Sequence, residues 1–399
     1  MPPSLPPELT DHIIDLLQSS PKSLKACSLV CSAWRPRAQH HIFEREVLIS
    51  QPKYDVYQKL IEESPRSCQH IRALGITQPP ETLPNGGDPR FLQFMHVVPL
   101  VSSTFSRVSR LALRSANIET LHQSENFKLD TVTELHLETI LAPNLTTLAE
   151  FICSFPNLAK LTVLNLHVAA DFSRSPVPGQ NLIAPCNPLL SKPAIKSLRF
   201  RDGFLRSSNH ILLTAWLFSE SMLASLTELE IDIQHKADIS VLAEVLKACG
   251  PQLRQLYLDV NLEKTNEDLC DKLTLRHCSS LRTLSFKSLH MASQGEDVIL
   301  RDLKWVSKAL EVNSPHIENI HFKIHAGGAV TEDMARLNWK EIGETLCAER
   351  FNTLRRVEFL VLCGNTWKDK IIPYIKAQVP ELEARGITNY RHIKWMGRN

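Results

Sequence analysis

The chain of 399 residues lacks an excess of charge of either sign. It contains 45 Lys and Arg against 43 Asp and Glu, which gives a formal net charge of +2. This balance argues against a dedicated nucleic-acid-binding protein, whose surface is usually strongly basic. Hydrophobic residues make up 43% of the chain, which excludes a largely disordered protein. The length is compatible with one elongated domain or about two to three ordinary ones.

Long apolar runs are also absent. No uncharged apolar run approaches the roughly 18 residues that a membrane span needs. The first residues, MPPSLPPELT, contain neither the basic start nor the apolar stretch of a signal peptide. We therefore expect a cytoplasmic or nuclear protein without membrane contact, in which thiols stay reduced. All ten cysteines are expected to be free, and most of them buried.

Catalytic and cofactor motifs are missing from the sequence. It has no G-x-S-x-G, no phosphate-binding loop, no H-E-x-x-H and no Cys-x-x-Cys. Cys27, Cys31, His40 and His41 do not predict zinc, because adjacent histidines on a helix point in different directions. We therefore predict no enzymatic activity, no cofactor and no metal.

Residues 5–46 carry helix signals without strand signals. Ser20 suits the N-cap of a second helix, and Pro21 suits its first helical position. Pro36 is compatible with a third helix only in its first turn. Three short helices bury little, so this module has more apolar side chains than its core can hide. We therefore predict a protein interface formed by Leu5, Pro6, Leu9, Ile13, Leu16, Leu29, Val30 and Trp34.

The same segment resembles an F-box. The family pattern is a Leu-Pro start, an acidic residue followed by Leu, an Ile, and a later Val-Cys-x-x-Trp-Arg sequence. These features are present as Leu5-Pro6, Glu8-Leu9, Ile13 and Val30-Cys31-Ser32-Ala33-Trp34-Arg35. The resemblance implies that residues 1–46 bind the Skp adaptor of a ubiquitin ligase, and through it a cullin. The alternative is a helical cap on the domain that follows.

From about residue 68 onward the chain repeats the pattern apolar-x-x-apolar-x-apolar. Successive copies start between 24 residues (Val108 to Val132) and 37 residues (Ile71 to Val108) apart. Leucine-rich repeats run about 20–29 residues, so the longer copies leave room for a helix and a loop. The ten copies are Ile71-Leu74-Ile76, Val108-Leu111-Leu113, Val132-Leu135-Leu137, Leu158-Leu161-Val163, Ile195-Leu198-Phe200, Leu226-Leu229-Ile231, Leu253-Leu256-Leu258, Leu281-Leu284-Phe286, Ile317-Ile320-Phe322 and Leu354-Val357-Phe359.

In each copy the last two apolar positions alternate with polar residues, which indicates a half-buried strand. The intervening segments 238–249, 267–277, 297–312 and 339–349 are predicted helices. A single strand–helix unit cannot bury its apolar face alone, so neighbouring units must stack. We therefore predict an α/β solenoid: an irregular, leucine-rich-repeat-like, curved parallel sheet with outer helices over residues 68–399. A linker helix at 47–67 and the three-helix F-box at 1–46 would precede it. The alternative is a compact α/β domain with a parallel sheet.

Three further features concern the solenoid. Cys153, Cys249 and Cys278 recur just before strands, and we expect them in the core. Residues 78–90 and 170–193 are rich in Pro, Asn, Gly and Ser and are predicted to be exposed loops. The basic segment 385–399 is predicted to cap the last repeat.

The strand alternation also nominates a target-binding surface. If the repeat leucines point into the core, their neighbours on each strand point out. An aromatic side chain surrounded by charges has the composition of an interaction hot spot. The alternative is that these charges only neutralise one another across neighbouring strands, which stabilises the fold little. The candidate target-binding residues are Arg199, Arg201, Glu228, Glu230, Asp232, Tyr257 and Asp259.

These observations predict a non-catalytic, substrate-recognition subunit of a Skp–cullin–F-box ubiquitin ligase. Its F-box would dock on the Skp adaptor, and its solenoid would bind a target protein that the sequence does not name. The rival hypothesis is a protein-interaction scaffold with no ubiquitin role.

Overall fold

The structure is a computed structural model, and it divides into two compact units, residues 1–193 and 194–399. It describes residues 5–44, 46–50, 56, 59, 62–63, 68, 71–77, 105–122, 129–168, 192–201, 209–233, 236–260, 273–290, 304–310, 316–326 and 338–394. Within this part of the chain, no helix has the length and apolar character that a membrane crossing requires.

The chain begins with the three predicted helices, α1 (Pro7–Leu16), α2 (Pro21–Val30) and α3 (Arg35–Glu44). Ser20 is the N-cap of α2, and its hydroxyl accepts a hydrogen bond from the backbone N–H of Ser23 at 3.4 Å. Pro36 lies in the first turn of α3, as its missing N–H requires. The small core of this helical module comprises Ile14, Leu24, Cys27 and Ala38, with Leu17, Trp34 and Ile42 packed against it.

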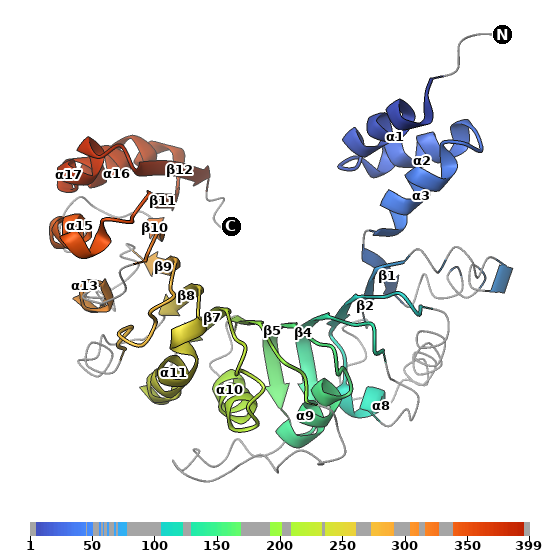
Figure 1. Ribbon diagram of the computed structural model, residues 1–399, viewed down its shortest axis with the longest axis horizontal. Coiled ribbons are helices and arrows are strands. Elements are labelled where there is room, and N and C mark those ends of the chain that lie inside the picture. Colours follow the sequence, from blue (N-terminus) through green and yellow to red (C-terminus); the bar gives the residue numbers. More distant parts are fainter. Residues whose placement is uncertain are drawn as a thin grey trace. The chain divides into compact units, whose positions relative to one another are not determined.

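Most of the described remainder of the first unit belongs to a parallel sheet whose strands pair in chain order. Helices α8 (Ile118–His122) and α9 (Leu145–Cys153) lie on one side of it (Figure 1). The strands are β1 (Glu46–Ser50), β2 (Ala73–Thr77), β3 (Arg110–Arg114), β4 (Glu134–Ala142) and β5 (Lys160–Val168). Neighbouring coils share one backbone feature, a positive φ at Ser115 (53°), Thr139 (54°) and Asn165 (53°). The same bend therefore recurs from coil to coil, as a repeat requires.

The second unit continues the same strand–helix alternation, again with parallel strands paired in chain order. Its strands are β6 (Ser197–Arg201), β7 (Glu228–Ile233), β8 (Gln255–Val260), β9 (Thr283–His290), β10 (Asn319–Ala326), β11 (Arg356–Cys363) and β12 (Thr388–Lys394). Its helices are α10 (Asn209–Ser219), α11 (Lys236–Cys249), α13 (Lys304–Leu310), α15 (Trp339–Cys347), α16 (Asn365–Gln378) and α17 (Pro380–Ala384), with 3-10 turns at Gly250–Gln252 and Glu349–Phe351. Figure 1 shows α11, α13 and α15 on one side of the strands; we call the opposite side of this sheet the open face.

The predicted fold class is confirmed. Each of the ten repeat motifs places its last two apolar residues on a strand, from Leu74 and Ile76 on β2 to Val357 and Phe359 on β11. Both strand residues of every motif are buried, and the space between strands and helices forms the core. Parallel strands paired in chain order, with helices in many of the crossovers, define an α/β solenoid rather than a sheet with rearranged strand order.

The core of the second unit contains a row of aromatic rings, one from each of four neighbouring strands. Phe322 stacks between Phe286 and Phe359, with centroid distances of 5.4 Å on both sides. Tyr390 extends the row at 5.0 Å from Phe359. Trp339 of α15 meets the edges of Phe322 and Phe359 at 5.5 and 5.7 Å. Equivalent strand positions therefore pack as a ladder, with offset and edge-on contacts that aromatic rings prefer.

The cysteine predictions hold where the structure describes them. Eight cysteines are described, and all eight are free. Cys153, Cys249 and Cys278 are buried in the core, as expected. Burial raises the pKa of Cys249 to about 11, and burial together with nearby Cys249 raises the pKa of Cys278 to about 12. These thiols are protonated at neutral pH and act as small apolar groups.

Two element predictions need correction. The segment 47–67 was expected to be a linker helix, but its start belongs to β1 (Glu46–Ser50), where Val47, Leu48 and Ile49 form a short strand-favouring run. Further along the segment, the described residues 56, 59, 62 and 63 are helical, as predicted. The helix expected at 267–277 is absent from its described part, since residues 273–277 are not helical. The predicted loop 78–90 and most of the predicted loop 170–193 lie outside the described residues.

The segment 385–399 was expected to cap the last repeat, and its described part does so. It contributes β12 at the end of the sheet. Arg385 donates hydrogen bonds to the backbone carbonyls of Leu346, Phe351 and Leu354 at 3.2 to 3.4 Å. These contacts give backbone carbonyls at the last described coil a hydrogen-bond donor.

Candidate functional site

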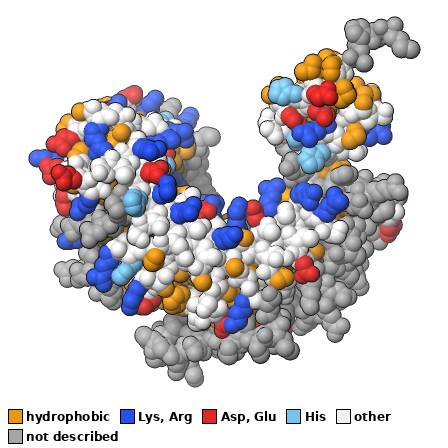
Figure 2. All heavy atoms as spheres, in the orientation of Figure 1, with side chains coloured by type: hydrophobic (Ala, Val, Ile, Leu, Met, Phe, Trp, Pro, Cys, Tyr) orange, Lys and Arg blue, Asp and Glu red, His pale blue; other side chains and the backbone are white. Residues whose placement is uncertain are grey.

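The helical module exposes most of the apolar side chains that were predicted to form an interface. Leu29 is 82% exposed and Leu16 is 69% exposed, although both are large aliphatic residues. Figure 2 shows hydrophobic side chains gathered on the surface of the module. We call this surface the apolar patch; it comprises Leu5, Leu9, Ile13, Leu16, Leu29 and Val30, all of which are exposed.

Helix geometry explains why the patch exists. Leu9, Ile13 and Leu16 lie four and three positions apart, so they share one face of α1. Ile14, which directly follows Ile13, lies on a different face of α1 and is fully buried in the module core. Because α1 is apolar on two faces and the module covers only one, the other remains at the surface.

Two other predicted interface residues have structural roles. Trp34 is partly buried and packs against the module core, so most of its contacts are with the core rather than with the exposed apolar patch. Pro6 is exposed, and its carbonyl accepts hydrogen bonds from the backbone N–H groups of Leu9 and Thr10, both at 3.1 Å. Pro6 therefore fixes the first turn of the helix that carries the patch.

A polar network that the sequence did not reveal ties α1 to α3. The Asp15 carboxylate accepts two hydrogen bonds from the Arg37 guanidinium, both at 2.7 Å. It also lies 2.6 Å from Nε2 of His41, whose ring is largely buried. The hydrogen bonds from Arg37 and His41 hold the pKa of Asp15 well below its usual range. This network sets the orientation of α1 on the module, because it is a bidentate, charge-assisted contact between helices distant in sequence.

Replacing Asp15 by Asn is expected to loosen α1 and to abolish an acid transition of the helical module. A carboxyl whose pKa is lower in the folded state stabilises the fold above its unfolded pKa and loses this effect as pH falls through the folded pKa. The wild-type module should therefore weaken below about pH 4, which is the ordinary Asp pKa. Susceptibility of residues 1–46 to an acid-stable protease, followed from pH 7 to pH 2, checks this. A variant that matches the wild type at every pH would contradict the role assigned to Asp15.

The second candidate surface lies on the open face of the second unit and is built around Glu230. Its carboxylate accepts hydrogen bonds from Nε of Arg201 on β6 and from Nζ of Lys287 on β9. On the same strand, Glu228 accepts from Nε of Arg199 at 3.1 Å. We call these five residues the Glu230 cluster.

The structure corrects the prediction that the acidic side chains of β7 are exposed. Glu230 is only 3% exposed, and Asp232 is also buried. Burial by itself raises the pKa of Glu230, but the hydrogen bonds from Arg201 and Lys287 outweigh it and lower that pKa. The alternation identified the correct side of the sheet, but long cationic side chains from neighbouring strands cover these carboxylates.

Tyr257 and Asp259 of β8 complete the predicted target-binding set, and both are partly buried. Lys287 lies 4.9 Å from the Tyr257 ring centroid, within cation–π range. Asp259 is the register partner of both Asp232 and Lys287. The structure thus brings all the predicted target-binding residues together on β6–β8, but as a set of mutually compensating charges.

A further charged cluster, on β10–β12, was not singled out from the sequence. The Glu358 carboxylate is nearly buried and lies 2.9 Å from His321, 3.1 Å from Arg356 and 3.0 Å from Arg391. Asn389 also donates to it, at 3.4 Å. Arg391 could not be placed in this cluster from the sequence because β12 lacks the repeat motif.

Comparisons with known proteins give little further guidance. No family model matches the chain, and no curated protein matches it. Among solved structures, a crystal structure of a protein from Bacteroides fragilis is 10% identical, with a TM-score of 0.36; the match covers 88% of this chain and 73% of that one. Similarity at this level carries no functional argument.

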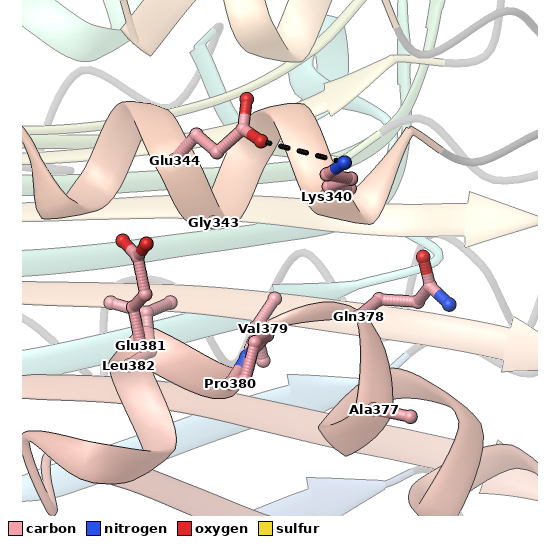
Figure 3. A pocket seen from close by; sticks show the side chains of 9 residues that line it. All are labelled: Lys340, Gly343, Glu344, Ala377, Gln378, Val379, Pro380, Glu381 and Leu382. Carbon is pink, nitrogen blue, oxygen red and sulfur yellow. Dashed lines mark ion pairs between the residues drawn. The ribbon is translucent and has the colours of Figure 1, made fainter.

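A small pocket in the second unit is lined by residues other than those of the Glu230 cluster. It has a volume of about 150 Å³ and is bordered by α15, by the end of α16 and by α17 (Figure 3). Lys340 and Glu344 at its rim form an exposed ion pair at 4.0 Å. The pocket holds no buried charged group, so we assign it no function.

Proposed function

We propose that the chain is the substrate-recognition subunit of a Skp–cullin–F-box ubiquitin ligase. In this proposal the apolar patch docks on the Skp adaptor, the solenoid holds a target protein, and the chain itself catalyses no reaction. The observation that carries the proposal is the exposure of Leu5, Leu9, Ile13 and Val30, which are positions of the F-box pattern.

Physical chemistry supports an obligatory partner for this patch. Six large apolar side chains stand exposed on a module of about forty residues, next to a core of only a few buried groups. Contiguous exposed apolar surface of this kind on a soluble domain usually marks an interaction site. An amphipathic helical surface with apolar residues three and four positions apart fits another helical protein.

Replacing Leu16 and Leu29 by Asp is expected to reduce capture of the Skp adaptor by about tenfold or more, because burying a charge in an apolar interface is costly. Both residues are exposed, so the helical module should stay folded. Val56→Asp is the matched control, since Val56 is an exposed apolar residue outside the patch. Co-purification from cells that co-express the adaptor gives the measurement.

The rival scaffold hypothesis makes a different prediction for the same experiment. A scaffold with no ubiquitin role would cover the apolar patch with another protein or a second copy of the chain. Failure of the wild-type chain to capture the adaptor would contradict the proposed function. Adaptor capture that is equal in the wild type and the patch variant would contradict the assignment of the surface.

A further inference from the structure

The open face of the second unit differs in charge between its two ends. Strands β6–β9 carry Arg199, Arg201 and Lys287 against Glu228, Glu230, Asp232 and Asp259. Their acidic side chains are held by these cations or lie beside them. This end is therefore saturated internally, and an incoming charged group would have to displace existing ion pairs.

The other end has more cations than its acidic group can neutralise. The open-face positions of strands β10–β12 carry Lys323, Arg356 and Arg391, and Glu358 is the sole carboxylate of these strands. Glu358 already contacts Arg356, Arg391 and His321. Arg391 nevertheless remains 64% exposed. On this face the strands therefore carry more cations than carboxylates.

Apolar groups lie among these cations. The register places Leu360 between Lys323 and Arg391, and it places Ile393 beside Leu362. Leu360 and Leu362 are partly exposed, and Ile393 is 48% exposed, which is unusual for isoleucine on a strand. We call Lys323, Leu360, Leu362, Arg391 and Ile393 the terminal patch.

The terminal patch adjoins the edge of the last described strand, β12. Among the described strands, β12 pairs with β11 alone and is last in the strand order. The carbonyl of Ile387 accepts a hydrogen bond from the N–H of Val357 at 2.9 Å, so it points toward β11. Polar backbone groups alternate in direction along a strand, so those of Thr388, Tyr390, His392 and Lys394 point away from β11. Such an edge is a template for one more strand.

We propose that the terminal patch and the β12 edge bind an acidic, extended segment of a partner protein. The segment's backbone pairs with β12, its carboxylates meet Arg391 and are attracted over a longer range by Lys323, and its apolar side chains meet Ile393, which lies beside Leu362. Main-chain pairing supplies affinity, and the alternate side chains supply selectivity, as in other cases of strand addition. This inference rests on the proposed function in one respect, because it takes the partner to be the target protein of the ligase. It places that target at β10–β12 rather than at the Glu230 cluster.

The test uses the full chain and three fluorescein-labelled probes: a peptide of alternating Glu and Val, a peptide of alternating Lys and Val, and an oligothymidine. Fluorescence anisotropy reports binding. We expect the acidic peptide to bind most tightly. Lys323→Glu with Arg391→Glu should weaken its binding by about tenfold or more. The matched control is Lys247→Glu with Lys340→Glu, the same charge change on the helical side, and it should change binding by less than about twofold.

A second pair of variants tests the strand edge. His392→Pro removes an outward-facing N–H without removing a hydrogen bond to β11, and it should weaken binding of the acidic peptide. His392→Ala controls for the loss of the hydrogen bond between the His392 ring and the Cys363 carbonyl. It should bind like the wild type.

Several outcomes would overturn the inference. These are equal weakening by the two charge-reversal pairs, tighter binding of oligothymidine than of the acidic peptide, and equal binding by the two His392 variants. Adaptor capture is measured in parallel with the same proteins. If the wild-type chain captures the adaptor but does not bind the acidic peptide, this inference is wrong and the ligase proposal stands. If it binds the acidic peptide but does not capture the adaptor, the ligase proposal is wrong and the terminal patch remains a binding site.

Discussion

Replacing Glu230 by Lys is expected to lower the free energy of unfolding of the second unit by about 3–5 kcal/mol, the usual cost of breaking a buried ion pair. The substitution places a third cation against Arg201 and Lys287, in a position that is only 3% exposed in the wild type. Asp232 and Asp259 lie near these cations, but Glu230 is the carboxylate that accepts hydrogen bonds from both of them. The result is both repulsion and an uncompensated buried charge.

Urea unfolding of the full chain, followed by tryptophan fluorescence, provides the measurement. Glu244→Lys is the matched control, because Glu244 is exposed on α11 of the same unit and should change stability by less than about 0.5 kcal/mol. If the two variants unfold at the same urea concentration, Glu230 is solvated and free to bind a partner. Equal stability would therefore restore the original prediction of an exposed acidic surface on β7.

Replacing Phe322 by Ala is expected to destabilise the second unit by about 3–5 kcal/mol, the range observed when buried aromatic residues are truncated. The Phe322 ring has no solvent exposure and contacts Phe286, Phe359 and Trp339. Its removal leaves a cavity in the middle of the aromatic row and breaks the stack on both sides.

The same urea experiment measures this effect. Phe322→Leu, which retains most of the apolar volume, should cost less than about 2 kcal/mol and is the graded control. A cost of the Ala variant below about 1 kcal/mol would mean that neighbouring coils repack freely around the gap. Such a result would contradict the tightly stacked core that defines the solenoid here.

The strands could be predicted because each repeat motif has one buried apolar residue before the strand and two within it. The two strands that were missed break this pattern at its first position. By register, the position of Ile71 before β2 corresponds to Glu44 before β1, and the position of Leu354 before β11 corresponds to Arg385 before β12. These strands lie at the ends of the strand order. Polar groups suit terminal positions, where one side of the core ends.

The candidate sites were predictable to different degrees. The apolar patch followed from counting: α1 has apolar residues on two faces, and three short helices can cover only one. The burial of Glu230 did not follow, because alternation gives the side of the sheet on which a residue lies and not what its neighbours cover. Arg201 lies on β6, directly beside β7, and Lys287 lies on β9, two strands away on the other side. Only the register of the strands shows that both side chains reach Glu230.

Hydrogen–deuterium exchange of the full chain, with and without a purified Skp adaptor, tests the central claim most directly. The account predicts a stable complex in which exchange slows in α1 and α2, around Leu9, Ile13, Leu16 and Leu29, and stays unchanged in β10–β12. Absence of a complex, or slowed exchange confined to the second unit, would contradict it.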